Sequence, residues 1–104
     1  MDTYFVYVTA AGEAEAMMIS RTVVEERLAA CANLLGSIQS IYWWEGKVCE
    51  GQEVALVLKT SGTRKDKLIE RIKQLHSYDC PAIACLPIEG GNSDFLNWIW
   101  QETT

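Results

Sequence analysis

The residues of this chain that could do chemistry are one histidine and four cysteines. His76 and Cys80 are separated by three residues, and imidazole and thiolate are the side chains that copper and similar soft or borderline ions prefer. Both could reach one ion across a turn, but two ligands do not complete a site, so a neighbouring subunit or water would have to supply the rest. The alternative is that His76 caps a helix and that Cys80 is a small buried apolar group.

The other three cysteines are weaker candidates for metal binding or catalysis. Cys31 and Cys85 fall at core-facing positions of a predicted helix and a predicted strand, which is typical of inert buried thiols. Cys49 lies on a predicted hairpin turn and, if exposed, is the thiol most open to oxidation or to metal capture. No C-x-x-C spacing occurs in the sequence, so neither a zinc knuckle nor a dithiol redox pair is predicted.

Length and charge restrict the class of protein and its partners. A chain of 104 residues is expected to form one domain, residues 1–104. The net charge of −5 does not favour binding to nucleic acid or to an anionic membrane. With no apolar run of about 20 residues and no basic region at its start, the sequence predicts a cytoplasmic protein with free thiols.

Hydrophobic periodicity predicts the elements that must position these side chains. We expect strands at 3–9, 33–45, 53–60 and 81–88, and helices at 13–31, at 63–76 and after 92. The second and third strands form a long hairpin. This order, βαββαβ followed by a C-terminal helix, predicts the ferredoxin-like α+β fold, in which two helices cover one face of a four-stranded sheet.

Local signals refine the helices. Met17, Val24 and Leu28 are predicted to share the buried face of the first helix with Cys31. Thr63 and Asp66 form a capping-box-like pair at the start of the second helix. Asn92, Ser93 and Asp94 are predicted to cap the C-terminal helix, which carries Trp98.

The strand segment 38–44 is apolar on both sides. Alternation places Ile38, Tyr42 and Trp44 on one side and Ile41 and Trp43 on the other. A two-layer subunit can bury only one of these sides, and each buried aromatic removes roughly 150–250 Å² from water. We therefore expect another copy of the chain to cover the second side. The alternative is that one tryptophan folds back on its own hairpin.

Several stretches along nearly the whole chain also occur, in the same order, in a known family. They are Glu26–Asn33, Ser40–Lys47, Leu58–Thr60, the pattern His76-x-Tyr78-x-x-Pro81, Leu86–Ile88, and Gly91-Asn92 ahead of Leu96-x-Trp98. In these stretches the chain resembles the CutA family of divalent-cation-tolerance proteins. The resemblance implies a ferredoxin-like subunit, a tight homotrimer built by the long hairpin, a role in tolerance to copper and other divalent ions, and no catalytic activity.

The chain departs from the family pattern near the candidate metal ligands. Ser77 stands where proline usually follows the histidine, and Ala82 replaces the usual acidic residue. No cysteine occurs within residues 3–9, where some members have one. A carboxylate that could have joined the metal site is therefore missing. Separately, no cofactor is expected to be required for folding.

Two other functions must be weighed. A hydrolase of the acylphosphatase kind needs an Arg in a phosphate-cradling loop and a nearby Asn; Arg64 and Asn92 could be nominated, but the loop 9–12 contains no Arg or Lys. An enzyme is therefore not expected.

The stronger alternative is a trimeric small-molecule sensor or scaffold, similar to nitrogen-regulatory signalling trimers. Clefts between subunits, lined by Tyr42, Trp43, Lys59 and Trp98, would form its pocket. The helix N-terminus at Asn92 could hold an anion there. Against this, Trp98 at helical spacing is typical of core or interface packing, and Lys59 could be a rim charge.

Overall fold

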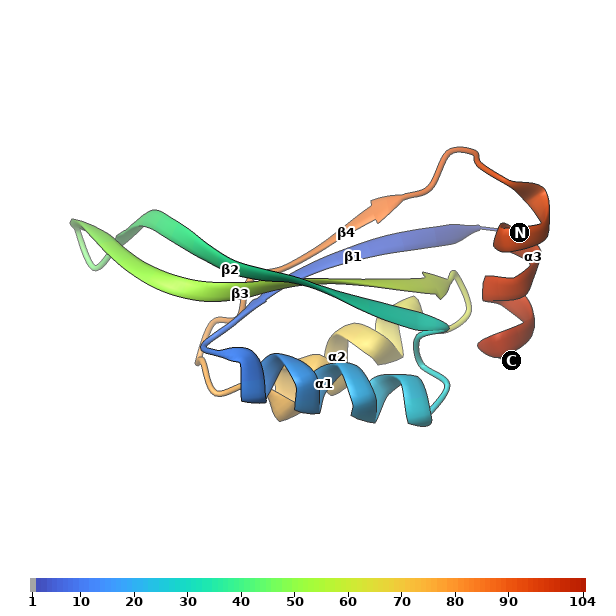
Figure 1. Cartoon of the computed structure of the whole chain (residues 1–104), viewed down its shortest axis with the longest axis horizontal. Helices are drawn as coiled ribbons and strands as arrows, with labels where there is room; N and C mark the ends of the chain where they lie inside the picture. Colours follow the sequence, from blue (N-terminus) through green and yellow to red (C-terminus); the bar gives the residue numbers. More distant parts are fainter. Residues whose placement is uncertain (1) are drawn as a thin grey trace.

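The computed structural model describes residues 2–104. It contains, in chain order, β1 (Thr3–Ala10), α1 (Glu13–Glu25), β2 (Cys31–Trp44), β3 (Lys47–Ser61), α2 (Lys65–Leu75), β4 (Ile83–Pro87) and α3 (Ser93–Glu102). The sheet is antiparallel with strand order β2-β3-β1-β4. Helices α1 and α2 lie on one face of this sheet, and α3 lies at the end farthest from the hairpin turn (Figure 1). The predicted ferredoxin-like order with an added C-terminal helix is confirmed.

The hydrophobic core lies between the helix layer and the sheet. Register pairs Val6 with Leu58 and Val8 with Leu56, so the side chains of β1 and β3 form one apolar face. Fully buried side chains of α1 and α2 pack on that face: Ala16, Ile19, Val23, Leu68 and Ile72. None of the helices in the described residues is long and apolar enough to cross a bilayer.

Helix α1 ends at Glu25, earlier than the predicted Cys31. Arg27 adopts a left-handed φ of 60°. The N–H of Leu28 then bonds to the Val23 carbonyl at 2.9 Å and that of Arg27 to the Val24 carbonyl at 3.0 Å. This pair of bonds closes a helix C-terminus, and no glycine marked it in the sequence.

Two predictions about the residues of the first helix were wrong. Cys31 begins β2 opposite Lys59 instead of ending the helix. Met17 is 45% exposed, because the buried face of α1 follows Ala16, Ile19, Ser20 and Val23.

The helix caps were predicted with mixed success. Helix α2 begins after Arg64 without a side-chain cap, so the capping box between Thr63 and Asp66 was wrong. At α3 the prediction is confirmed, because Asn92 Oδ1 accepts a bond of 3.0 Å from the N–H of Asp94. Helix α3 is fixed to the sheet at its other end, where Thr103 Oγ1 donates to Ser61 Oγ at 2.8 Å.

The hairpin of β2 and β3 extends well past the rest of the sheet (Figure 1). Its turn is Glu45-Gly46, with φ of 50° and 77°, the two positive values of a tight two-residue turn. Strand β1 pairs with β3 only as far as Val54, so residues 38–53 have no third strand beside them. We call this segment the projecting hairpin; it gives the molecule its longest dimension of 44 Å.

Candidate functional site

The α2–β4 connection, residues 76–82, begins with a buried histidine. The side chain of His76 has no exposed surface. Its Nε2 lies 2.7 Å from the carbonyl oxygen of Thr9, and its Nδ1 accepts a bond of 3.1 Å from the N–H of Tyr78. Both ring nitrogens are therefore engaged, and the ring joins the end of β1 to the start of the connection. His76 is also the C-cap residue of α2, as the alternative interpretation held.

Glu15 of α1 fixes the next residue of the connection. Its Oε1 accepts a bond of 2.6 Å from the N–H of Ser77, and its Oε2 accepts bonds of 3.1 Å from Ser77 Oγ and 2.9 Å from the N–H of Ala11. Burial raises the pKa of this carboxyl, but the bonds from Ala11 and Ser77 outweigh it, so the pKa lies below its ordinary value. The connection is thus anchored to the helix layer through a carboxylate.

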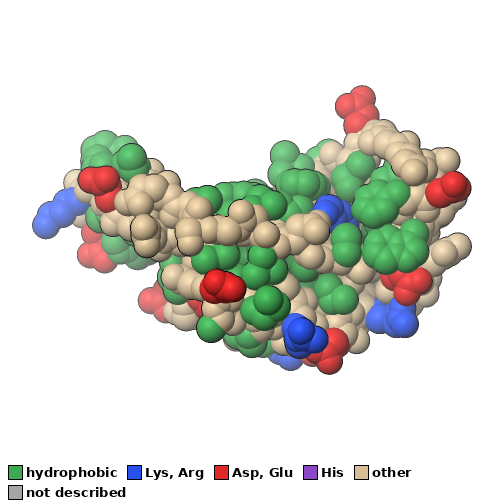
Figure 2. All heavy atoms as spheres, viewed as in Figure 1, with side chains coloured by type: hydrophobic (Ala, Val, Ile, Leu, Met, Phe, Trp, Pro, Cys, Tyr) green, Lys and Arg blue, Asp and Glu red, His purple; other side chains and the backbone are tan. Residues whose placement is uncertain are grey.

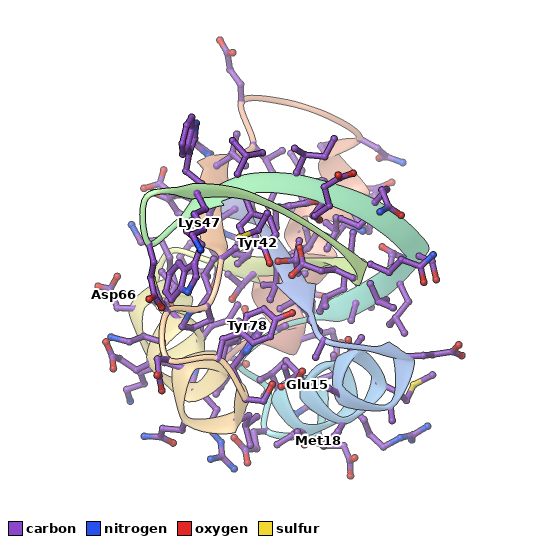
Figure 3. The ribbon with its side chains drawn as sticks, turned by 90° about the vertical axis from the view of Figure 1, so that its left-hand side faces the viewer. Glu15, Met18, Tyr42, Lys47, Asp66 and Tyr78 are labelled. Carbon is purple, nitrogen blue, oxygen red and sulfur yellow. The ribbon has the colours of Figure 1, made fainter. Side chains whose placement is uncertain are left out.

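Tyr78 links the same connection to the projecting hairpin. Its phenol donates to Glu53 Oε2 at 3.1 Å, and its ring lies 4.7 Å from that of His76. In Figure 3 the labelled Tyr78 lies between Tyr42 of the hairpin and Glu15 of α1. Burial, then the bond to Glu53 and the nearby negative charges, raise the pKa of Tyr78 to about 12. The phenol therefore keeps its proton, and the bond to Glu53, at neutral pH.

A cavity of about 600 Å³ lies between the hairpin and the connection. The strands contribute Thr9, Ser40, Ile41, Tyr42, Trp44 and Glu53 to its lining. The connection contributes Tyr78, Asp79, Cys80 and Ala82. Aromatic rings, two carboxylates and a thiol therefore face one space.

The two predicted metal ligands lie in this region in different environments. Cys80 is exposed at the cavity, whereas His76 is buried with both nitrogens bonded. Within residues 2–104 no three His, Cys, Asp or Glu side chains lie close enough together to hold a metal ion. The residues of one described chain therefore do not fit a complete metal centre.

The aromatic residues predicted to form an interface are exposed. On the face of the projecting hairpin that carries Ile41 and Trp43, these side chains are 67% and 74% exposed; on the opposite face Tyr42 and Trp44 are 45% and 51% exposed. The pairing register, Tyr42 with Cys49 and Trp43 with Val48, confirms that the two sets point to opposite sides. Figure 2 shows hydrophobic side chains gathered at this end of the molecule.

The remaining candidate residues lie far from the cavity. Lys59 is on β3 beside Phe5 and Cys31, and its Nζ donates to Asn33 Oδ1. Trp98 stacks on Phe95 of α3, with ring centroids 5.8 Å apart. Helix α3 lies at the opposite end of the molecule from the hairpin turn (Figure 1). A single chain therefore does not bring Lys59, Asn92 or Trp98 together with Tyr42 and Trp43.

Sequence reasoning missed Glu15 and Glu53, whose carboxylates fix the connection. Glu15 is separated from Ser77 by 62 positions and Glu53 from Tyr78 by 25. No spacing rule connects residues so far apart. Of Glu15, Glu53 and Tyr78, only Tyr78 could have been found from the sequence, because it lies in the pattern His76-x-Tyr78-x-x-Pro81.

Fold and site together define a ferredoxin-like α+β protein with an extended aromatic hairpin and a cavity at the hairpin's base. The family model described as CutA1 divalent ion tolerance protein matches residues 4–102. The chain belongs to this family.

Relatives from distant organisms are similar over most of this chain. The divalent-cation tolerance protein CutA of Thermus thermophilus is 45% identical over 94% of this chain and 95% of its own length. The chloroplastic protein CutA 1 of rice is 41% identical over 94% of this chain, which spans 55% of that longer protein. The crystal structure of CutA from Xylella fastidiosa superposes with a TM-score of 0.96 at 35% identity, covering 100% of both chains.

Proposed function

We propose that this protein contributes to tolerance of divalent metal ions as a homotrimer in the cytoplasm, by binding and not by catalysis. Membership of the divalent ion tolerance family supports the metal-ion role. The single observation that carries the assembly is the exposed apolar surface on both faces of the projecting hairpin.

The energetics of that surface favour association. Trp43, Ile41 and Val48 are more than half exposed on one face of a hairpin that only two strands support. A large aromatic side chain removes roughly 150–250 Å² from water when it is covered, which is worth several kcal/mol at about 25 cal/mol per Å². The free edges of β2 and β4 offer unpaired backbone groups to a neighbour. A ring of three copies would cover both the apolar side chains of the hairpin and the unpaired strand edges.

The mass of the protein in solution tests the assembly. We expect sedimentation to give about 35 kDa, three times 11.7 kDa. Replacing Trp43 by Ser should shift the mass toward one copy at micromolar concentration. Met18→Ser is the matched control, because Met18 is also exposed but lies on α1. A mass of about 12 kDa for the unmodified chain would contradict the proposal.

Copper binding is the first test of the metal-ion role. Cys80 is the accessible soft ligand of the two predicted positions, and a second copy or solvent would have to supply further ligands. We expect Cys80→Ser to abolish copper binding and Cys49→Ser to leave it intact. His76→Ala should disturb folding more than copper affinity, because both ring nitrogens already bond within the chain. Copper binding that survives Cys80→Ser would exclude this site.

A small-molecule sensor is the second candidate function, and the cavity at the hairpin's base favours it. Its volume of about 600 Å³ lies within the range of ligand sites in proteins, roughly 300–1,000 Å³. The charged side chains of its described lining are the carboxylates Glu53 and Asp79, so this cavity does not favour an anion. The anion predicted at Asn92 would bind at the start of α3, away from this cavity (Figure 1). A small ligand that fits this cavity should raise the melting temperature.

A further inference from the structure

The lining of the cavity at the hairpin's base combines two features that select one class of ligand. Tyr42, Trp44 and Tyr78 contribute aromatic rings, and Glu53 and Asp79 contribute carboxylates. Within the described chain, no Lys, Arg or His side chain lines the cavity, so these negative charges are not neutralised by its walls. The space is therefore electronegative and partly apolar.

We propose that this cavity binds an organic ammonium ion, that is, a positively charged amine carried on a small apolar body. A cation is attracted to the face of an aromatic ring and more strongly to a carboxylate in a partly desolvated site. The apolar body would contact the rings. This inference rests on the small-molecule function and does not require copper binding at Cys80, which lines the same cavity.

Glu53 is the residue that would fix the ammonium group. Its Oε2 already accepts a bond from the phenol of Tyr78, which holds the carboxylate in place. That bond occupies one oxygen and leaves Oε1 to accept from a ligand. The carboxylate is thus oriented before a ligand arrives, which reduces the entropy lost on binding.

Other charged ligands fit the cavity less well. An inorganic metal ion needs three or more clustered ligands, and the described residues contain no such group. A phosphate or carboxylate ligand would meet like charge on Glu53 and Asp79. A neutral apolar molecule would gain from the rings but nothing from the two carboxylates.

Calorimetric titration of the protein with matched probes tests the proposal. The probes are 2-phenylethylammonium, the neutral 2-phenylethanol of similar shape, and the anionic 3-phenylpropionate. We expect the ammonium ion to bind about 10-fold more tightly than the alcohol, the usual effect of one charge-assisted hydrogen bond. The anion should bind most weakly.

Two variants locate the binding. Glu53→Gln keeps the size of the side chain and an acceptor for Tyr78, and it should weaken ammonium binding about 10-fold without changing alcohol binding. Glu50→Gln is the control, because Glu50 is on the same strand but does not line the cavity. Circular dichroism establishes that both variants fold.

Three results would overturn the inference. Equal binding of ammonium and alcohol would leave a small-molecule pocket without preference for a cation. Unchanged ammonium binding in Glu53→Gln would place the ligand elsewhere. Binding of neither probe would exclude both the ammonium site and the small-molecule function of this cavity.

Discussion

The phenolic oxygen of Tyr78 lies 3.1 Å from Glu53 Oε2, and this bond joins the α2–β4 connection to the projecting hairpin. It brings together a loop and a strand that share no pairing in the sheet. After burial, the same bond is the second cause of the raised pKa of the phenol.

We expect one of the four tyrosines to titrate at about pH 12, well above its ordinary value of 10. Burial, then the bond to Glu53, raise the pKa of Tyr78. The stability that the protonated phenol contributes is therefore complete below pH 10 and is lost as the pH rises through about 12. Absorbance of tyrosinate follows the titration. Tyr78→Phe should remove the highest transition; loss of a transition near 10 instead would contradict the assignment.

Glu15→Gln should destabilise the protein at neutral pH by about 1–3 kcal/mol, because the N–H groups of Ala11 and Ser77 lose a charged acceptor. The folded pKa of Glu15 lies below its ordinary value of 4.5, so the stabilisation is complete above 4.5 and is lost as the pH falls through the lower folded value. Urea denaturation over this range measures it. Glu13→Gln is the control on the same helix turn, and an equal effect of both substitutions at pH 7 would refute the prediction.

Gly46→Ala should destabilise the hairpin turn by about 1 kcal/mol. Gly46 has a φ of 77°, a conformation that strains a residue with a Cβ, although no atom lies within 4 Å of the position that the new methyl would take. Gly51→Ala is the matched control, with equally open space and no positive φ. Denaturation midpoints at one protein concentration compare them, and equal stability of the two variants would rule out strain at the turn.

Alkylation should distinguish Cys80 from Cys31 and Cys85. We expect iodoacetamide to modify Cys80 first, because it is the exposed one. Burial raises the pKa of Cys31, although the charge of Lys59 lowers it, and burial also raises the pKa of Cys85. Both should react slowly at neutral pH. Peptide mass mapping over time gives the order, and modification of Cys31 or Cys85 before Cys80 would be inconsistent with this burial.

The element order could be predicted from the sequence because periodicity is a local property. The end of α1 could not, because Arg27 adopts a left-handed conformation that glycine usually marks. The exposed Met17 shows the same limit: several apolar residues of α1 compete for one buried face, and only contact with the sheet decides between them.

The candidate site was predictable only in part. Alternation alone placed Tyr42 and Trp43 on opposite sides of the hairpin, and the pairing confirms it. The cavity depends on contacts between the hairpin and the connection, which are distant in sequence. The chemistry of His76 depends on Thr9, a partner 67 positions away. The residues next to His76 in the sequence therefore could not show that its ring is bonded within the chain and not available to a metal ion.

The α2–β4 connection bonds to Thr9 in the sheet, Glu15 in the helix layer and Glu53 in the hairpin. A displacement of this connection must therefore break bonds in all three places at once. Amide protons held here, such as that of Ser77, should exchange with solvent only through a cooperative opening, and not through the local fraying that is usual for an exposed loop.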